Sequence, residues 1–320
     1  MNIIDYVRKT FEDSMGISSC FIHGLDGVSN NRVFIIETEK KSYIFKIYAQ
    51  ADWPEDGKLP FVAQKLDEYK IAHARIYDFS RKNVAFPNGY LIEERLPGIT
   101  ANKLNLTQDE NIRLYEKLAV IVSEIHKIRL INYGFIGGNG IADWTSMSDY
   151  IYDFFNDSTS CLREKNIIAP VKLDYIRQKL YEEIKACDCY PPVLCHGDLS
   201  TSNILVNADD IVIIDWDDAQ ALCWMADIAR LTYWMRLRYD ERSYKAYRNA
   251  FLKRYESEYD KSAFDKMENA FHIWYGLDYL NFAAGRLDYN KHCEAIKTVL
   301  ENDLVRAGWF DDSNDIGGRI

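Results

Sequence analysis

The hydrophobic pattern of the sequence changes near Pro97–Gly98, and this change limits the folds that the chain can adopt. Short β-rich runs precede it, notably residues 32–38 and 42–48, which are separated by a charged turn. Beyond it, apolar residues recur at helical spacing, beginning after the capping box of Thr107 and Glu110. The sequence therefore predicts an α+β protein whose strands come first and whose helices follow.

The same patterns predict secondary structure along the whole chain. Helical spacing indicates the segments 3–11, 60–69, 107–127, 146–165, 171–187, 222–238, 241–256, 264–284 and 290–306. The expected strands are 32–38, 42–48, 74–77, 90–94, 204–206 and 211–214. Because a Pro-Gly pair favours a boundary, we expect two domains, residues 1–97 and 98–320. The glycine-rich segment 134–140 is expected to be a surface loop.

Composition narrows the class of partner. The chain has 39 Lys and Arg residues against 49 Asp and Glu residues, a formal net charge of -10. This charge repels nucleic-acid backbones and attracts cationic small molecules, so nucleic acid is not an expected partner. No apolar run reaches the length of a membrane span and the first residues do not resemble a signal peptide, which predicts a cytoplasmic protein without membrane contact. The seven scattered cysteines are expected to be reduced thiols.

A short hairpin carries the first functional signal. Two apolar runs, 204–206 and 211–214, flank residues typical of a turn. A hairpin centred near residue 209 places Asn203 opposite Asp215, with Cβ atoms about 4.5–5.5 Å apart. Amide and carboxylate oxygens suit Mg²⁺, so Asn203 and Asp215 are the expected metal ligands.

The segment His196-Gly-Asp198 lies directly upstream of this hairpin. His196, Asp198 and Asn203 have the H-x-D-x-x-x-x-N spacing of the catalytic loop of kinases. In that loop the aspartate accepts the proton of the substrate hydroxyl. Singly, these residues would be solvated turn residues or a satisfied core histidine. Together with Asp215 they predict a phosphoryl-transfer site in which Asp198 is the catalytic residue.

Phosphoryl transfer also requires a cation and backbone amides on the nucleotide phosphates. The sequence has no G-x-x-x-x-G-K-[ST] motif, which excludes a P-loop. The small-residue loop 24–31 is the expected replacement, and Gly27, Ser29 and Asn30 are its candidate nucleotide contacts. Lys46 is the expected cation, because an ammonium inside an apolar strand needs a partner.

The strand 90–94 continues into Glu94-Arg-Leu-Pro-Gly98, which we interpret as a hinge between two lobes. The backbone of such a hinge can read adenine. Glu93 and Arg95 are therefore further candidate residues of the nucleotide site.

Taken together, these residues resemble the aminoglycoside phosphotransferase and choline kinase family of eukaryotic-like kinases. The resemblance rests on Lys46, the Glu93–Gly98 hinge, His196–Asp198, Asn203 and Ile214–Ala219. It implies a two-lobe fold like that of eukaryotic protein kinases, with a nucleotide-binding β-sheet lobe and a helical catalytic and acceptor-binding lobe. It also implies ATP or GTP and Mg²⁺ as cofactors and a hydroxyl group as acceptor.

Three segments narrow the resemblance within that family. Residues 132–146, Asp215–Trp216 and Tyr275–Leu280 are similar to the hygromycin B phosphotransferases. This similarity implies an aminoglycoside antibiotic such as hygromycin B as acceptor and a role in antibiotic resistance. Two features differ from other members: helix 60–69 has no well-placed acid to pair with Lys46, and no Ala-Pro-Glu segment follows Asp215, which argues against a protein substrate.

The acceptor site is expected to be acidic. The candidate acceptor contacts are Trp216, Asp217, Asp218 and Asp278, and further acids are available at Asp227, Glu256, Glu258 and Asp288. Asp217 and Asp218 have two other possible roles: they support the metal site, or they are turn residues that face water. Two other functions share much of this pattern. One is a kinase for choline, a sugar or another metabolite, and the other is a nucleotide-binding pseudoenzyme that regulates a partner.

Overall fold

The chain forms two compact units in the computed structural model. The model describes residues 2–18, 20–25, 31–81, 83–208, 210–285 and 291–310. The first unit comprises Met1–Leu104, Ile136–Gly140 and Thr201–Ala219. The second comprises Asn105–Phe135, Ile141–Ser200 and Gln220–Ile320.

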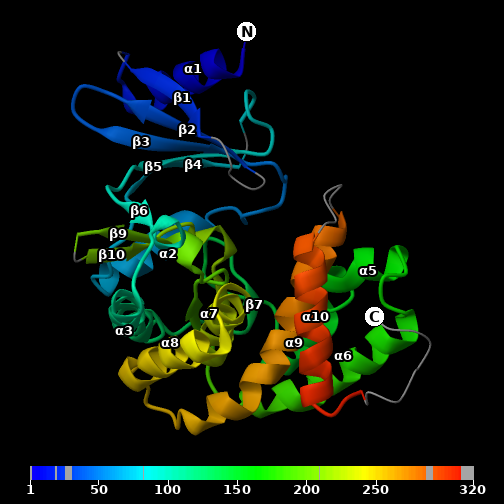
Figure 1. Ribbon diagram of the computed structural model, residues 1–320. Helices are drawn as coiled ribbons and strands as arrows, with labels where there is room; N and C mark the ends of the chain where they lie inside the picture. The colour runs from blue at the N-terminus through cyan, green and yellow to red at the C-terminus, as the bar shows by residue number, and fades with distance from the viewer. Residues whose placement is uncertain are drawn as a thin grey trace. The chain divides into compact units, whose positions relative to one another are not determined.

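A five-stranded antiparallel sheet forms the centre of the first unit (Figure 1). Its order in space is β1 (Phe21–Leu25), β2 (Arg32–Glu37), β3 (Ser42–Ile47), β5 (Tyr90–Glu94) and β4 (Ile76–Ser80). Strands β2 and β3 form the predicted hairpin, and β5 has its predicted bounds. The sequence does not predict β1, because His23 and Gly24 interrupt its apolar run.

Side-chain alternation gives this sheet two different faces. On one face, helix α1 (Ile3–Met15) packs Val7 and Phe11 into a buried core that includes Phe45 and Ile92. Gly16 ends α1 in a left-handed conformation, and its N–H donates to the carbonyl of Glu12. The first unit therefore has its main hydrophobic core between α1 and the sheet.

The opposite face carries polar as well as apolar groups. Lys46 and Leu91 are neighbours across β3 and β5, one position away from the residues that face α1. Helix α2 (Lys58–Glu68) contributes Leu59 and Val62 to a pocket that these two strand residues also line. This face of the sheet holds the nucleotide-site candidate Lys46.

The predicted catalytic hairpin belongs to the first unit. It forms a second sheet in the order β10 (Asp210–Ile213), β9 (Ile204–Asn207) and β6 (Ile99–Thr100). Strand β6 follows the proposed hinge directly, so its pairing with β9 joins the hairpin to residues 1–104. The predicted boundary at residue 97 instead assigns this hairpin to the C-terminal domain.

The register of this hairpin differs from the predicted one by a single position. Asp210 pairs with Asn207 and Ile213 with Ile204, so the next pair is Ile214 with Asn203. The N–H of Ile214 donates to the carbonyl of Asn203 at 2.9 Å, which confirms this register. The prediction that Asp215 lies directly opposite Asn203 is wrong, because the turn is centred midway between positions 208 and 209 and not at 209.

The second unit is mainly helical. Its helices are α3 (Gln108–Ile125), α4 (Met147–Phe154), α5 (Ser160–Glu164), α6 (Pro170–Ile184), α7 (Trp224–Arg238), α8 (Glu241–Arg254), α9 (Ser262–Gly285) and α10 (Lys291–Arg306). Helix α3 packs on α8, and α9 packs on α7 and α10. The predicted capping box of Thr107 and Glu110 is present at the start of α3. Among the described residues, no helix combines the length and apolar character needed to cross a membrane.

Two sequence predictions for later segments are corrected by the structure. The predicted helix 146–165 is broken between α4 and α5, because the hydroxyls of Ser158 and Thr159 donate to the carbonyl of Phe155. The segment 134–140 begins with strand β7 (Gly134–Phe135), and β7, β11 (Gln220–Leu222) and β8 (Val193–Cys195) form a small sheet.

The rest of that glycine-rich segment, residues 136–140, belongs to the first unit and is a loop in which Gly138 and Asn139 are exposed, as the sequence predicts. The N–H of Gly138 donates to the carbonyl of Asp56 at 3.0 Å. A Cβ atom added at Gly138 would lie 3.0 Å from the Cα of Gly57, so the two backbones need glycine here. Close backbone packing accounts for the glycine at position 138.

Candidate active site

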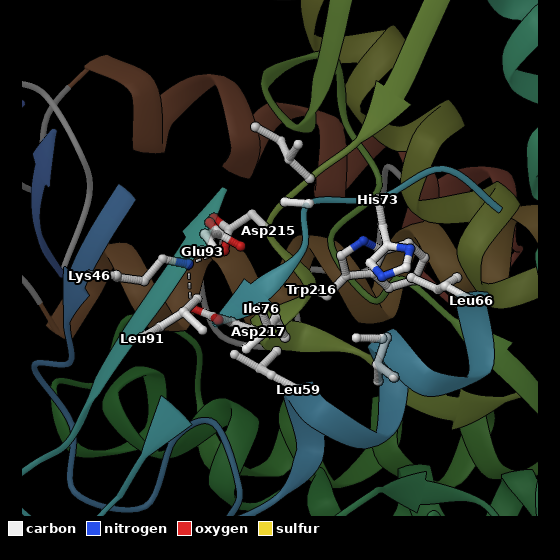
Figure 2. A pocket seen from close by; sticks show the side chains of 14 residues that line it. Lys46, Leu59, Leu66, His73, Ile76, Leu91, Glu93, Asp215, Trp216 and Asp217 are labelled. Atoms are coloured by element: carbon white, nitrogen blue, oxygen red, sulfur yellow. Dashed lines mark hydrogen bonds and ion pairs between the residues drawn. The ribbon is translucent and has the colours of Figure 1, made fainter. Parts of the chain in front are cut away.

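Lys46 is the centre of an ionic cluster in the first unit. The antiparallel register places it on the α2 side of β3, where it is only 6% exposed. Its Nζ donates to Oδ1 of Asp215 at 2.7 Å and to Oδ2 of Asp217 at 3.0 Å (Figure 2). Two carboxylates that follow β10 therefore hold the predicted nucleotide-site cation.

Asp217 is the more buried of these carboxylates. It lies in the short 3₁₀ turn Trp216–Asp218, where Tyr48 donates its hydroxyl to Oδ1 at 3.2 Å. Asn31 Nδ2 lies 3.4 Å from Oδ2, and the ammonium of Lys58 donates to the backbone carbonyl of Asp217 at 3.1 Å. The structure thus places Asp217, a candidate acceptor contact in the sequence analysis, among the residues that surround Lys46.

The electrostatics of the cluster keep Lys46 charged. Burial disfavours the ammonium, but the carboxylates of Asp215 and Asp217 outweigh burial and hold the pKa of Lys46 well above its usual value. Burial raises the pKa of Glu93 to about 7, although the charge of Lys46 opposes this rise. Glu93 and Lys46 approach each other on the same face of the sheet (Figure 2).

Helix α2 supplies apolar contacts, and not the acid that kinases of this type usually place opposite the strand lysine. Leu59, Val62 and Leu66 of α2 line the pocket beside Lys46. Glu55, just before the helix, pairs with Lys58. The sequence shows no well-placed acid in helix 60–69. In the structure, Asp215 and Asp217 provide the carboxylates that pair with Lys46.

Trp216 closes the same pocket. It is 9% exposed, and its indole N–H donates to the carbonyl of Ile213 at 3.3 Å. His73 and Ile76 line the same pocket (Figure 2). Trp216, a predicted acceptor contact, is therefore part of the wall of the Lys46 pocket, and the neighbouring Asp218 is half-buried.

The predicted metal ligands lie at the open end of the hairpin. Asn203 is 8% exposed, whereas the side chain of Asp215 is 46% exposed. The backbone of Asp215 is left-handed, with φ 66°, an uncommon conformation for a residue other than glycine, asparagine or aspartate. An amide oxygen and an exposed carboxylate are hard donors, so the chemistry of this pair fits Mg²⁺.

Arg95, another predicted residue of the nucleotide site, has partners other than Lys46. Arg95 is exposed, its Nη1 lies 3.2 Å from Oε1 of Glu37, and its backbone N–H donates to Ser42. Gly27, Ser29 and Asn30 lie outside the described residues.

Asp198 lies in the second unit, on the loop that follows β8. Gly197 in this loop has φ +80°, and the carboxylate of Asp227 accepts the N–H of His196 at 2.8 Å and that of Gly197 at 3.0 Å. Burial opposes the charge of Asp227, but the hydrogen bonds and charge of His126 and His196 lower the pKa of Asp227 below its usual value. Asp227 therefore holds the loop backbone, and it is buried and does not face water.

Side chains of α7 and α9 surround Asp198. Tyr279 donates its hydroxyl to Oδ1 of Asp198 at 2.9 Å, and Nε of Arg230 lies 3.8 Å from the same oxygen. Arg230 Nη2 also lies 3.6 Å from Oδ2 of the predicted acceptor contact Asp278. Neither Tyr279 nor Arg230 is predicted as a site residue from the sequence, although the spacing of Tyr275, Asp278 and Tyr279 on one helical face indicates a shared environment.

Comparison with known proteins agrees with this arrangement. Residues 22–264 match the phosphotransferase enzyme family, so the chain belongs to that family. The predicted class, a phosphotransferase with a hydroxyl group as acceptor, is confirmed. No match was found among curated proteins.

Solved structures confirm the predicted fold. A thermostable mutant of aminoglycoside phosphotransferase APH(4)-Ia, in a ternary complex with AMP-PNP and hygromycin B, superposes with a TM-score of 0.71 at 18% identity, covering 94% of this chain and 98% of that chain. An ethanolamine kinase from Plasmodium vivax gives 0.70 at 16% identity, covering 96% and 90%. Choline kinase LicA from Streptococcus pneumoniae gives 0.67 at 14% identity, covering 96% and 99%. The chain therefore has the two-part α+β fold of kinase-like phosphotransferases.

Proposed function

We propose that the protein transfers the γ-phosphoryl group of ATP or GTP to a hydroxyl group of a small molecule. The observation that carries the proposal is the Lys46 cluster, in which a buried ammonium lies 2.7 Å from the predicted metal ligand Asp215. A charged lysine beside a metal-binding carboxylate is the arrangement that nucleotide phosphates require. Family membership supports the same reaction class.

Lys46 stabilises the negative charge of the phosphates. Because its carboxylate partners keep it protonated, it can donate hydrogen bonds to phosphate oxygens without first gaining a proton. Asn203 and Asp215 would hold Mg²⁺, which neutralises charge on the phosphate oxygens when bound. Asp217 accepts a hydrogen bond from Lys46, and Tyr48 donates its hydroxyl to the other carboxylate oxygen of Asp217.

Asp198 acts on the acceptor. Its carboxylate orients the acceptor hydroxyl and accepts the hydroxyl proton as the oxygen bonds to the γ-phosphorus. The bond between that phosphorus and the bridging oxygen breaks, and the nucleoside diphosphate leaves. Asp227 fixes the backbone on which Asp198 stands, so the base is presented in one orientation.

The acceptor is an aminoglycoside antibiotic such as hygromycin B, and the gene confers resistance. Two observations favour this finer proposal: the likeness to a fold that holds hygromycin B in APH(4)-Ia, and a net charge of -10 that attracts a polycation. Asp278 and Asp218 are the candidate contacts to its ammonium groups. The protein acts in the cytoplasm.

A kinase of choline or a related amino alcohol is the second candidate, favoured by the likeness to choline and ethanolamine kinases. A nucleotide-binding pseudoenzyme is disfavoured, because Lys46, Asp198, Asn203 and Asp215 are all present.

The experiment is a panel of acceptors with MgATP and MgGTP. We expect phosphorylation of hygromycin B by the wild type, detected as a mass increase of one phosphate. Asp198→Asn should lower the transfer rate by roughly 10²–10⁴-fold while leaving nucleotide affinity nearly unchanged. Turnover of choline, without turnover of hygromycin B or kanamycin, would show that the acceptor is choline and not an aminoglycoside. Turnover by Asp198→Asn at the wild-type rate would refute the assignment of Asp198.

A further inference from the structure

Two helices of the second unit direct one face each toward the catalytic loop. On α9, Tyr275 and Tyr279 are at positions i and i+4 and therefore lie on the same face of the helix. On α7, Arg230 and Trp234 have the same spacing. Since α7 and α9 pack together, these side chains share one environment beside Asp198.

The hydroxyl of Tyr279 is held in a fixed position. Its ring stacks on that of Tyr233, with centroids 5.9 Å apart and an interplanar angle of 4°. It also makes a T-shaped contact with the ring of Trp234, with centroids 4.4 Å apart. The hydroxyl then donates to Oδ1 of Asp198 at 2.9 Å. A ring confined between two aromatic neighbours loses little further entropy when its hydroxyl binds the carboxylate.

Arg230 reinforces the same contact from the other side. Its guanidinium lies between the rings of Tyr275 and Tyr279, 4.4 and 4.5 Å from their centroids. Its Nε donates to the carbonyl of Gly197 at 3.0 Å. Arg230 thereby connects the residue that precedes Asp198 to the ring that binds the Asp198 carboxylate.

We propose that Tyr279 is a positioning residue for Asp198, with Arg230 as the support that fixes both the tyrosine ring and the loop backbone. Tyr279 directs one carboxylate oxygen, Oδ1, so that the acceptor hydroxyl gives its proton to the other. This inference rests on the proposed function, because it concerns the orientation of its catalytic base. A base that is free to rotate is in the productive orientation for a smaller fraction of encounters.

The test is Tyr279→Phe, which removes the hydroxyl and keeps the ring beside Arg230. With MgATP and hygromycin B, and with choline as a second acceptor, we expect the kcat of phosphoryl transfer to fall about tenfold or more, as for loss of a hydrogen bond to a charged group. The KM for MgATP and the nucleotide affinity should stay within about twofold, because Lys46, Asn203 and Asp215 are untouched.

Tyr233→Phe is the matched control. Tyr233 stacks on Tyr279, and its hydroxyl has no hydrogen-bond partner in the part of the chain that the structure describes. This variant should transfer phosphate at the wild-type rate. An equal loss of kcat in both variants would assign the effect to packing and overturn the inference.

The remaining outcomes separate the inference from the proposed function. Wild-type transfer that disappears in Asp198→Asn but is unchanged in Tyr279→Phe overturns the positioning role and leaves the proposed function standing. Loss of nucleotide affinity in Tyr279→Phe also overturns it, because the residue then supports the fold in general. A wild type that binds MgATP but phosphorylates neither acceptor removes the proposed function and this inference together.

Discussion

The ammonium of Lys46 lies 3.0 Å from the carboxylate of Asp217, which comes from the turn after the β9–β10 hairpin and not from helix α2. The same turn supplies Asp215, so two nearby residues share one buried cation. Their environments differ, because the side chain of Asp217 is 9% exposed and that of Asp215 is 46% exposed. The buried Asp217 is therefore suited to be a permanent partner of Lys46. The more exposed Asp215 is suited to bind Mg²⁺ as well.

Replacing Asp217 with asparagine should weaken both the fold and nucleotide binding. Breaking a buried ion pair costs about 3–5 kcal/mol, but Asp215 remains as a partner of Lys46, so we expect the free energy of unfolding to fall by about 1–3 kcal/mol. Nucleotide affinity should fall as well, because Lys46 is less well positioned. Urea unfolding and calorimetry with MgATP measure the two effects.

Asp210→Asn provides the control for Asp217→Asn. It makes the same change of charge at an exposed position at the start of β10, and surface changes usually alter stability by less than about 0.5 kcal/mol. If Asp217→Asn were no more destabilising than Asp210→Asn, Asp217 would not be the anchor of Lys46.

Asp215→Ala should abolish the effect of Mg²⁺ on nucleotide binding. The exposed carboxylate is the charged member of the predicted ligand pair, and a neutral asparagine alone binds a divalent cation weakly. Calorimetric titration with ATP, with and without Mg²⁺, gives the measurement. Asp217→Asn should retain the Mg²⁺ dependence, and an Asp215→Ala variant with the wild-type Mg²⁺ dependence would exclude this residue as a ligand.

Local patterns predict much of this architecture. The position of Lys46 in β3 and the capping box at Thr107 depend on short-range spacing, and the structure contains both of them. The hairpin was also predictable, but its register was not, because Ile211–Ile214 and Ile204–Val206 are apolar at nearly every position. A uniformly apolar run does not distinguish two pairings that differ by one residue.

Long-range contacts explain the parts that the sequence did not predict. Asp217 meets Lys46 across an interval of 171 residues, and Tyr279 meets Asp198 across 81. Periodicity shows that Tyr279 is on a helical face but not which loop that face meets. The glycines of 134–140 were likewise ambiguous, because a close backbone contact and a phosphate-binding loop use glycine for the same reason.

His272 should make the stability of the second unit depend on pH. Burial, opposed by Glu268, lowers the pKa of this imidazole to about 3, so it is neutral in the folded protein. Arg236 donates to Nδ1 at 2.9 Å, which leaves Nε2 to donate to Thr232 at 3.0 Å. In the unfolded chain the imidazole takes up a proton near pH 6.5.

The sign follows from proton uptake by the unfolded state. The stability contributed by neutral His272 is complete above pH 6.5 and is lost as the pH falls toward 3, at about 1.4 kcal/mol per pH unit. Urea unfolding between pH 7.5 and 5 measures it. His272→Gln should be less stable at pH 7.5 and should lose less stability on acidification, and an unchanged slope in this variant would exclude His272 as the source.

The Michaelis constant of the acceptor should report its charge. A polycationic aminoglycoside attracted by a protein of net charge -10 binds more weakly as salt screens that attraction. The Debye length falls from about 10 Å at 0.1 M to about 3 Å at 1 M ionic strength, so the Michaelis constant for hygromycin B should rise over that range. Nucleotide affinity, measured separately at each salt concentration, corrects for screening at the phosphates.

The local charges near Asp198 make this salt dependence specific to the acceptor. Asp198 and Asp278 share the single guanidinium of Arg230, at 3.8 and 3.6 Å, so the group has more carboxylates than cations. Asp278→Asn should reduce both the affinity for hygromycin B and the slope of its Michaelis constant against salt. A Michaelis constant that does not change with salt in the wild type, together with turnover of a neutral sugar, would exclude a polycationic acceptor while leaving the phosphotransferase assignment in place.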